Sequence, residues 1–411
     1  MNYSSGNHKI LNDPVYGFIK IPSGLISEII SFPCFQRLRR IKQLGLTYMV
    51  YPGANHNRLQ HVLGAMHLMQ EAIDVLRSKD NDISDEEEEA VLIAILLHDI
   101  GHGPFSHSLE HSIIENITHE EISIMYMNKI NEKLNGKLSL AIDIFRNRYH
   151  KKYLHQLVSG QLDTDRLDYL NRDSFFTGVT EGVVGSERII KMLDVVDDEL
   201  VVEEKGIYSV EKFLIARRLM YWQVYLHKTV VSAEQLLINI MKRAKHLAMK
   251  NTDVFATPQL KYFLTNSFDK NYIAENSEEI LNNFTLLDDN DIISSIKQWS
   301  FHKDFILSEL SKMLTNRVLP KTILQKNNFT KAEFDAKKQE ISKKMQLTDE
   351  QVSYFVISGK LSNKAYSYTD EKIKIKLKTG ITSDIQNVSD MLNVPVLSKS
   401  DEKHFLTFPK I

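Results

Sequence analysis

The chain is poor in the features that would place it outside the cell or in a membrane. Cys34 is the one cysteine in 411 residues, which excludes a disulfide framework and favours a reducing compartment. No run of about 18 uncharged apolar residues occurs, and the first ten residues lack the apolar core of a signal peptide. We therefore expect a cytoplasmic protein without a membrane partner.

The chain also lacks a strong net charge. Its 51 Lys+Arg and 53 Asp+Glu give −2, which argues against a protein built mainly to coat nucleic acid. The charge is unevenly distributed: residues 321–411 hold 16 Lys and 11 Asp+Glu, a net +5, so the first 320 residues carry −7. No motif in the sequence supports a nucleic-acid partner, and any polyanion-binding surface is expected in this basic region.

The apolar pattern predicts a mainly α fold. Before residue 320, apolar residues recur at helical spacing almost continuously, and beyond it short β-rich segments appear. We expect a helical domain over 1–320 and a small basic α+β domain over 321–411. Predicted helices span 25–44 (broken at Pro33), 57–77, 85–99, 119–134 and 209–250 (one helix or two). A β-hairpin is predicted at 193–210, and strands at 353–359, 372–378 and 404–408.

Histidine is concentrated in one part of the chain. Eight of the 15 histidines lie between residues 56 and 119, and the apolar segment 90–97 leads directly into His98-Asp99. A buried carboxylate such as that of Asp99 is costly unless it is paired or bound to a metal. An isolated pair of this kind more often ends a helix, but four neighbouring patterns favour a site.

Arg58 and His61 share one helix face, where they offer a phosphate-binding fork and a metal-binding imidazole. Segment 161–173 places Asp165 on one stripe with other polar residues, which alone would indicate a solvated face, but interleaved leucines mark it as packed. The loop GHGPFSH (101–107) brings further imidazoles close to Asp99. A mixed set of nitrogen and oxygen ligands suits Fe, Mn, Zn, Co or Ni.

In that loop and the segment after it, His107 and Glu110 are spaced so that the carboxylate can orient the imidazole and raise its pKa, which suits a general acid. His119 begins the next predicted helix, where backbone donors favour an anion. No Gly-x-Ser-x-Gly, Walker A or G-x-G-x-x-G motif occurs, which removes several common hydrolase and kinase alternatives.

The order and spacing of His61, His98-Asp99 and Asp165 resemble the H…HD…D signature of the HD-domain phosphohydrolases. More specifically, the chain is similar to the deoxynucleoside triphosphate (dNTP) triphosphohydrolase branch, which includes a vertebrate enzyme with a sterile alpha motif and bacterial relatives. The motifs that carry this resemblance, all between residues 12 and 250, are NDPVYG (12–17), FQRLRRIKQLG (35–45), YPGANHNRLQH (51–61), HDIGHGPFSH (98–107), DTDRLDY (163–169) and YLHK (225–228).

The resemblance implies an HD-domain helical bundle and attack of metal-bound hydroxide on the α-phosphorus, which gives a deoxynucleoside and tripolyphosphate. The implied metal ligands are His61, His98, Asp99 and Asp165, with Mg as an optional second, triphosphate-bound ion. The implied catalytic residues are His107, Glu110, His102 and His119. His107 would protonate the leaving 5′ oxygen, and Glu110 would orient the His107 imidazole. His102 and His119 would contact the α-phosphate. A homodimer or homotetramer is expected by analogy.

The implied substrate-binding residues divide by the part of the nucleotide that they contact. Arg58, Arg166, Arg217 and Lys228 would hold the triphosphate. Tyr169 and Tyr225 would pack on the sugar, Gln43 would reach its 3′-hydroxyl, and Asp173 belongs to the same set.

Three positions depart from the vertebrate pattern. Glu110 and Arg166 replace Asp and Lys, and Ser31 replaces the Asp that recognises the guanine of an activator. A serine cannot supply that paired acceptor, so we expect no activation by guanine nucleotides.

Two other functions stay open. One is HD-type hydrolysis of another phosphoester (a nucleoside monophosphate, a dinucleotide or a cyclic nucleotide), because His102, His107 and His119 leave room for a second metal. The other is a nucleotide-sensing or nucleic-acid-binding protein that keeps an HD scaffold. Base preference, native metal, oligomeric state and the role of residues 321–411 are not determined by the sequence.

Overall fold

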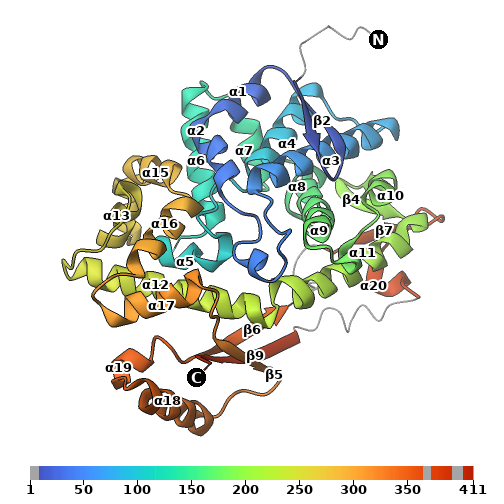
Figure 1. Cartoon of the computed structure of the whole chain (residues 1–411). Coiled ribbons are helices and arrows are strands. Elements are labelled where there is room, and N and C mark those ends of the chain that lie inside the picture. Colours follow the sequence, from blue (N-terminus) through green and yellow to red (C-terminus); the bar gives the residue numbers. More distant parts are fainter. Residues whose placement is uncertain (1–8, 116, 364–371, 391–400, 411) are drawn as a thin grey trace.

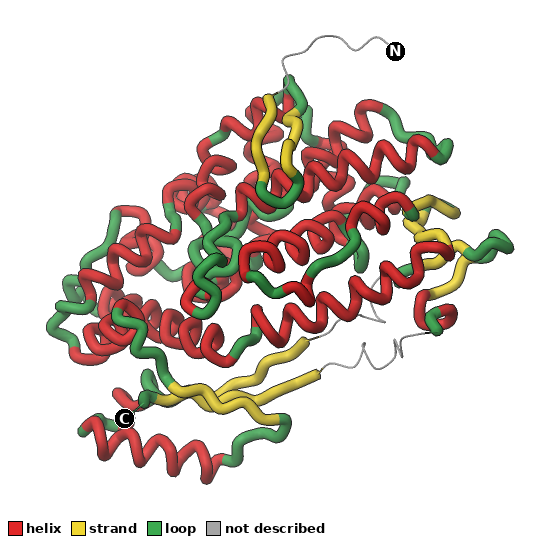
Figure 2. The backbone as a smooth tube through the Cα atoms, turned by 45° about the vertical axis from the view of Figure 1, so that its right-hand side comes forward, coloured by secondary structure: helices red, strands yellow, loops and turns green. Residues whose placement is uncertain are grey.

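A computed structural model describes residues 9–115, 117–363, 372–390 and 401–410. Helices dominate it, with small sheets at the periphery (Figures 1 and 2), so the mainly α prediction is confirmed. The helices that build the body around the site are α1 (Leu25–Ser31), α2 (Pro33–Gln36), η1 (Arg37–Arg40), η2 (Thr47–Met49), α3 (Arg58–Ser78), α4 (Asp85–Leu97), η3 (Ser106–Ser108), α5 (Glu110–Ile113), α6 (His119–Lys133), α7 (Ser139–Phe145), α8 (Lys152–Ser159), α9 (Thr164–Thr177), η4 (Thr180–Gly182) and α10 (Ser186–Lys191).

Reciprocal side-chain caps fix where the central helices begin. The Ser84 hydroxyl accepts a bond from the backbone N–H of Glu87, and the Glu87 carboxylate accepts one from the backbone N–H of Ser84. The same arrangement starts α3 at Asn57 and α6 at Thr118. Such caps satisfy backbone donors that a helix leaves unpaired. They place the first turn of α3 and the last turn of α4 where the site residues are needed.

The helix α4 is buried on every side from residue 90 to residue 97 and packs between α3 and α7. Because all its faces are apolar, it can stay only in the middle of the bundle. The first polar residues after this run are His98 and Asp99, which therefore emerge at the inner edge of the core.

Segment 207–249 forms two helices, α11 (Ile207–Met220) and α12 (Lys228–Met249), joined through a π-helical turn, η6 (Tyr221–Tyr225). Figure 1 shows α12 along the lower side of the helical body. The helices α13 (Pro258–Thr265), α14 (Lys270–Glu275), α15 (Ser277–Leu286), α16 (Asp289–Trp299) and α17 (Phe305–Thr315) complete this body.

A hairpin is present within the predicted range 193–210, but it ends at residue 203 and the rest of the range is helical. Strands β3 (Leu193–Val196) and β4 (Glu199–Glu203) pair antiparallel, and the chain turns at Asp197 and Asp198, both of which have positive φ. Short polar residues of this kind tolerate the left-handed conformation. Residues 204–206 form a 3₁₀ turn, η5, and Ile207, expected in the second strand, begins α11.

The region after residue 320 contributes to two sheets. Strands β5 (Lys321–Gln325), β9 (Asp401–Phe408) and β6 (Ile357–Asn363) form one, with α18 (Lys331–Met345) and α19 (Asp349–Val352) nearby. Strands β7 (Lys374–Lys376) and β8 (Thr382–Asp384), followed by α20 (Ile385–Val388), extend the β3–β4 sheet, because β7 pairs parallel with β4. The division at residue 320 stays a prediction, since part of the second region completes a sheet of the first.

The lysines of the expected strand at 372–378 face carboxylates of the neighbouring hairpin. Lys376 Nζ lies 2.6 Å from Asp194, and Lys374 pairs with Glu199, while Ile373 and Ile375 are buried. At the N-terminus, β1 (Lys9–Asp13) and β2 (Gly17–Ile21) form a separate hairpin. None of the described helices combines the length and apolar character that a bilayer crossing requires.

Candidate active site

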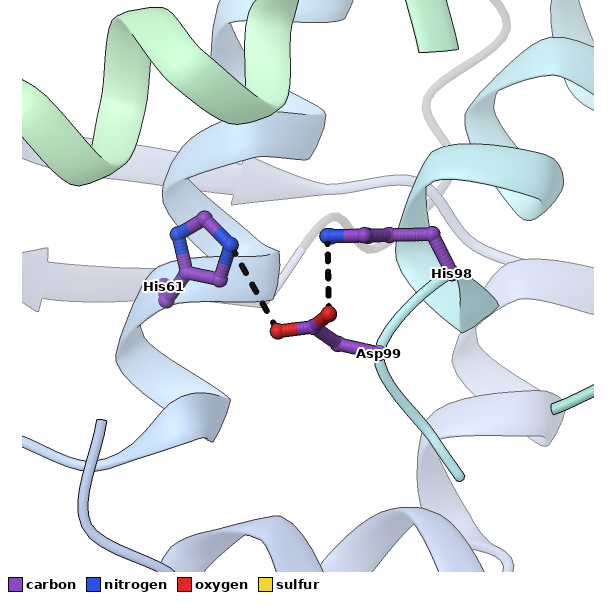
Figure 3. Close-up of side chains that lie close together, drawn as sticks. All are labelled: His61, His98 and Asp99. Carbon is purple, nitrogen blue, oxygen red and sulfur yellow. Dashed lines mark ion pairs between the residues drawn. The ribbon is translucent and has the colours of Figure 1, made fainter. Parts of the chain in front are cut away.

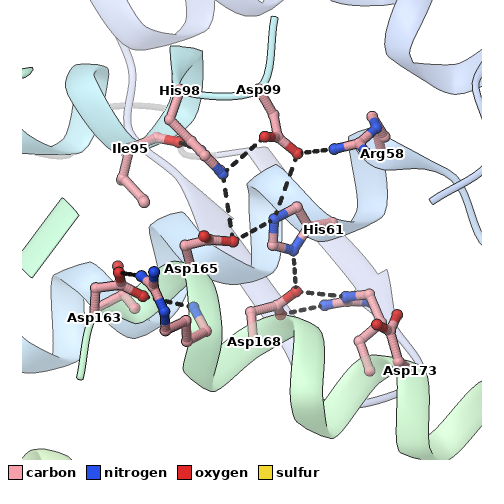
Figure 4. A network of polar contacts seen from close by, with 12 residues as sticks. Arg58, His61, Ile95, His98, Asp99, Asp163, Asp165, Asp168 and Asp173 are labelled. Atoms are coloured by element: carbon pink, nitrogen blue, oxygen red, sulfur yellow. Dashed lines mark hydrogen bonds and ion pairs between the residues drawn. The ribbon is translucent and has the colours of Figure 1, made fainter. Parts of the chain in front are cut away.

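Three helices bring the predicted metal ligands to one point. His61 lies on α3, His98 and Asp99 follow α4, and Asp165 lies in the first turn of α9 (Figure 4). His61 Nε2 lies 3.1 Å from Asp165 Oδ1 and 3.7 Å from Asp99 Oδ2. His98 Nε2 lies 3.3 Å from Asp99 Oδ1 and 3.5 Å from Asp165 Oδ1. Figure 3 shows both imidazoles directed at the Asp99 carboxylate.

Each of the two histidines is oriented through its other ring nitrogen. His61 Nδ1 lies 2.7 Å from Asp168 Oδ2, and His98 Nδ1 lies 2.6 Å from the carbonyl oxygen of Ile95. These acceptors accept the hydrogen bond of Nδ1, so Nε2 is the atom through which each imidazole would bind a metal once the metal displaces the second proton. Both Nε2 atoms are buried and make no hydrogen bond of normal geometry with the described residues. This donor set fits a divalent transition metal.

The electrostatics of the cluster favour positive charge at its centre. Burial alone would lower the pKa of His61, but the carboxylates of Asp165 and Asp168 outweigh it and raise that pKa to about 10. The pKa of Asp165 falls below its usual range, because the two imidazoles outweigh the effect of burial. Protons shared between these groups compensate the buried negative charge that a metal would otherwise neutralise.

Close packing of α3 against α9 makes the His61–Asp168 contact possible. A Cβ atom at Gly64 would lie 2.1 Å from Asp168 Oδ1, so only glycine fits this position on α3. Arg172, one turn along α9, donates to both oxygens of Asp168 at 2.9 Å and also to Asp13 on β1. The N-terminal hairpin is thereby connected to the orientation of His61.

An arginine side chain also holds Asp99 in place. Arg58 forms an ion pair with Asp99, and its Nε donates to Ser106 Oγ at 2.9 Å. Arg58 and the imidazoles keep the pKa of Asp99 well below its usual range despite complete burial. The predicted phosphate ligand Arg58 is therefore bonded to a predicted metal ligand in this structure.

A second cluster adjoins the first through the same aspartate. Asp99, His102 and His119 offer ligand atoms that all lie within 4.8 Å of one another, as do His61, His98 and Asp99. The rings of His102 and His119 stack with centroids 3.9 Å apart. Gly101 permits this approach, because a Cβ atom there would lie 2.1 Å from the His119 carbonyl oxygen.

Of the predicted His107–Glu110 pair, the structure describes only the side chain of Glu110. The side chain of His107 lies outside the described residues. Glu110 Oε1 accepts bonds from the His119 backbone N–H at 2.9 Å and from His119 Nδ1 at 2.6 Å. The described structure thus shows Glu110 orienting His119, a contact that the sequence interpretation did not include.

A cavity of about 1090 Å³ opens beside the metal ligands. This volume suits a ligand of nucleotide size. Among the predicted site residues, those that line it are Gln43, Arg58, His98, Asp99, His102, His119, Asp165, Arg166, Tyr169, Asp173, Arg217 and Tyr225. His61 is buried behind the wall. Lys228 is exposed and is not among the lining residues, so the structure does not bring it to the cavity.

Several lining residues are held by neighbours. Asp173 lies 2.7 Å from His56 Nε2 and accepts a bond of the same length from the Tyr225 hydroxyl. Tyr225 makes an edge contact with Tyr169. Arg166 forms an ion pair with Asp163, the cap of its own helix. These bonds fix aromatic and charged groups in place before any ligand enters.

The sequence interpretation left three kinds of site residue unassigned. Asp168 and Arg172 belong to the polar stripe of segment 161–173, and their helical spacing from Asp165 is the signal that could have given them a role. Tyr221 lies in the π turn and lines the cavity. Glu234 on α12 also lines it and accepts a bond of 2.8 Å from Ser108. An acidic residue within a long amphipathic helix gives no sequence signal for such a position.

Comparisons with known proteins agree with this geometry. The HD domain family matches residues 58–173, and the HD associated region matches residues 184–262. A crystal structure of a phosphohydrolase from Bacteroides thetaiotaomicron superposes with a TM-score of 0.94 at 52% identity, covering 98% of this chain and 100% of that chain. The uncharacterized protein YwfO of Bacillus subtilis is 31% identical over 100% of this chain and 95% of its own length.

The human deoxynucleoside triphosphate triphosphohydrolase SAMHD1 is 32% identical over 54% of this chain and 42% of its own length. The segment that matches the HD domain family, residues 58–173, contains the convergent histidines and aspartates described above. The chain therefore belongs to the HD-domain phosphohydrolases, on the branch that resembles the dNTP triphosphohydrolases.

Proposed function

We propose that this protein hydrolyses dNTPs to the deoxynucleoside and tripolyphosphate. One observation carries the proposal: two buried imidazole Nε2 atoms and two carboxylates converge at the wall of a cavity large enough for one nucleotide. The similarity to relatives named as dNTP triphosphohydrolases, from human and from Dictyostelium discoideum, supports this choice of substrate.

His61, His98, Asp99 and Asp165 would hold the metal. A divalent transition metal there would lower the pKa of a bound water and polarise a phosphoryl oxygen. Asp168 and the Ile95 carbonyl accept bonds from the Nδ1 atoms and so turn both Nε2 atoms toward the proposed metal position. His102 and His119, stacked beside Asp99, would contact the α-phosphate.

The remaining predicted residues divide between substrate and leaving group. Tyr169 and Tyr225 would pack on the deoxyribose, with Gln43 on its 3′-hydroxyl, and Asp173 keeps Tyr225 in position. Arg166 and Arg217 would hold phosphate oxygens. As the bond between the α-phosphorus and the 5′ oxygen breaks, His107 would supply the proton that the departing nucleoside needs.

A second candidate function has its own supporting observation. The cluster of Asp99, His102 and His119 could hold a second metal ion, and paired ions are typical of enzymes that hydrolyse phosphodiesters and phosphomonoesters. In that case the substrate would be another nucleotide phosphoester, and orthophosphate or a mononucleotide would appear as product.

The test is to load the protein with Mn, Fe, Zn, Co or Ni and to offer it dNTPs, NTPs, mononucleotides and cyclic nucleotides. Tripolyphosphate, identified by phosphorus NMR, together with a deoxynucleoside is the expected result. Orthophosphate or a mononucleotide as the sole phosphorus product would contradict it in favour of the second candidate. Absence of turnover with every metal would favour a nucleotide sensor.

A further inference from the structure

The arginines of the active-site cavity differ in how they are neutralised. Arg58 is ion-paired with Asp99, and Arg166 with Asp163. Arg146 and Arg148 line the same cavity, and neither forms an ion pair with a carboxylate of the described ranges. The sequence interpretation gave these two arginines no role, and no other function described above uses them.

The backbone that carries this pair is fixed. After α7, the N–H of Arg146 donates to the Ile142 carbonyl at 2.9 Å, and that of Arg148 to the Asp143 carbonyl at 2.8 Å. Asn147 between them has φ +54, a conformation that asparagine tolerates better than most residues. On α8, Nδ1 of His155 lies 3.0 Å from the Ile144 carbonyl oxygen and fastens the loop. A fixed loop holds its charged groups near their binding positions at a reduced entropic cost.

The loop that carries Arg146 and Arg148 is positioned by helices that pack against those of the proposed metal ligands. The loop joins α7 and α8; α7 packs on α4 and α8 on both α4 and α9, the helices that present His98 and Asp165. The residues proposed to bind the sugar come from other elements: Gln43 from the segment before η2, and Tyr225 from the π turn before α12. The arginine pair and the sugar residues thus approach the metal ligands from different elements.

We infer that Arg146 and Arg148 form an anion subsite for the distal phosphates of the substrate's triphosphate chain. This inference rests on the proposed function. Hydrolysis between the α-phosphorus and the 5′ oxygen requires the nucleoside and the polyphosphate to leave the reacting phosphorus in different directions. Guanidinium forks bind phosphate oxygens in pairs.

The difference in neutralisation explains why Arg146 and Arg148 should bind phosphate more readily than Arg58 and Arg166. Arg58 and Arg166 already bond to buried carboxylates, so a phosphate must compete with those partners. Arg146 and Arg148 have no such carboxylate to give up within the described ranges, and they supply positive charge that the exposed Lys228 does not bring to the cavity. Glu120, exposed on α6, lines the cavity without an ion pair to either arginine.

The test measures binding without turnover. Inorganic tripolyphosphate and orthophosphate are titrated calorimetrically into the metal-loaded full chain, for wild type, Arg146→Gln, Arg148→Gln and the double variant. Arg188→Gln, an exposed arginine on α10, is the matched control. We expect the double variant to bind tripolyphosphate at least about tenfold more weakly, as for a lost charge-assisted hydrogen bond, with orthophosphate binding and the control unchanged.

Two results would overturn the subsite. One is a tripolyphosphate affinity within about twofold of wild type, and the other is an equal loss for orthophosphate, which would indicate a disturbed metal centre. Circular dichroism checks folding, and the single Arg148→Gln change, at an exposed side chain, provides a variant that leaves the core untouched. If dNTPs yield no tripolyphosphate while the double variant still loses tripolyphosphate binding, the proposed function fails and the subsite stands.

Discussion

His61 Nδ1 and Asp168 Oδ2 lie 2.7 Å apart, across the contact between α3 and α9, and both side chains are fully buried. This bond sets the direction of His61 Nε2, and Arg172 in turn fixes both oxygens of Asp168. The orientation of one proposed metal ligand therefore depends on a residue that would not touch the metal.

We expect Asp168→Asn to weaken metal affinity by about 10- to 100-fold, the usual effect of losing a carboxylate behind a ligating histidine. Metal titration followed by calorimetry measures the change. Glu187→Gln, at an exposed ion pair on α10, is the control and should bind metal as the wild type does. Equal metal affinity in Asp168→Asn and wild type would show that His61 needs no such support.

Removing the proposed ligands themselves should have a larger effect. Asp165→Ala, or the double change His98→Ala and Asp99→Ala, should abolish both metal occupancy and turnover while the helical content stays near that of wild type. Metal content by mass spectrometry and product assays provide the readout, with Asp349→Ala on the exposed start of α19 as control. Full turnover without metal would contradict the metal-dependent mechanism.

Arg37 should matter for stability. It is completely buried and donates to the carbonyl oxygens of Ile100 at 2.9 Å, His102 at 2.8 Å and Leu287 at 3.3 Å. Arg37→Met would leave these carbonyls without a donor, so we expect the free energy of unfolding to fall by about 3 kcal/mol. Urea denaturation measures it.

Arg39→Met is the control for Arg37→Met, because Arg39 is exposed two residues away. Its stability should stay within about 0.5 kcal/mol of wild type. A loss of the same size in both variants would mean that the bonds from Arg37 to the loop after α4 do not stabilise the fold.

Glu234 should make stability depend on pH. Burial raises the pKa of Glu234 from 4.5 to about 7, and the bond from Ser108 offsets only part of that rise. Because the folded state keeps the proton to higher pH than the unfolded chain, the contribution of Glu234 to stability is greatest below pH 4.5 and falls as the pH rises through 7.

Glu234→Gln cannot ionise and should escape this loss. Relative to wild type it should gain stability between pH 5 and pH 8, by at most about 3 kcal/mol. Thermal melts at the two pH values test this, with Glu275→Gln at the exposed end of α14 as control. A stability difference between variant and wild type that does not change with pH would refute the buried-acid interpretation.

Guanine nucleotides should not activate the enzyme. Ser31 at the end of α1 donates its hydroxyl to the Glu28 carbonyl at 2.6 Å and offers no carboxylate to a guanine edge. Initial rates of dNTP hydrolysis with and without GTP should agree, and Ser31→Asp provides the matched comparison. A several-fold rise in the wild type alone would show that another residue recognises the activator.

Local chemistry explains what could be predicted. Apolar periodicity identified α3, α4 and α6, and the reciprocal caps of these helices lie within a few residues of their starts. The predicted metal set came from motifs that resemble the HD family, and those motifs lie on α3, after α4 and on α9. Tertiary packing leaves no periodic pattern in the sequence, so features that depend on it could not be predicted. These features are the Glu110–His119 bond, the bonds from Arg37 to the loop after α4 and the exposure of Lys228.

The parallel pairing of β4 with β7 has a consequence for synthesis. Val201 on β4 pairs with Lys374 on β7, which is synthesised roughly 170 residues later. At ordinary rates of elongation this delay is about 10 to 35 s. Until β7 is synthesised, one edge of β4 has unpaired backbone N–H and C=O groups that can pair with a strand of another chain. The helices that carry the proposed site are synthesised well before that edge is closed, so a nascent chain is exposed to aggregation after its proposed active site has been assembled.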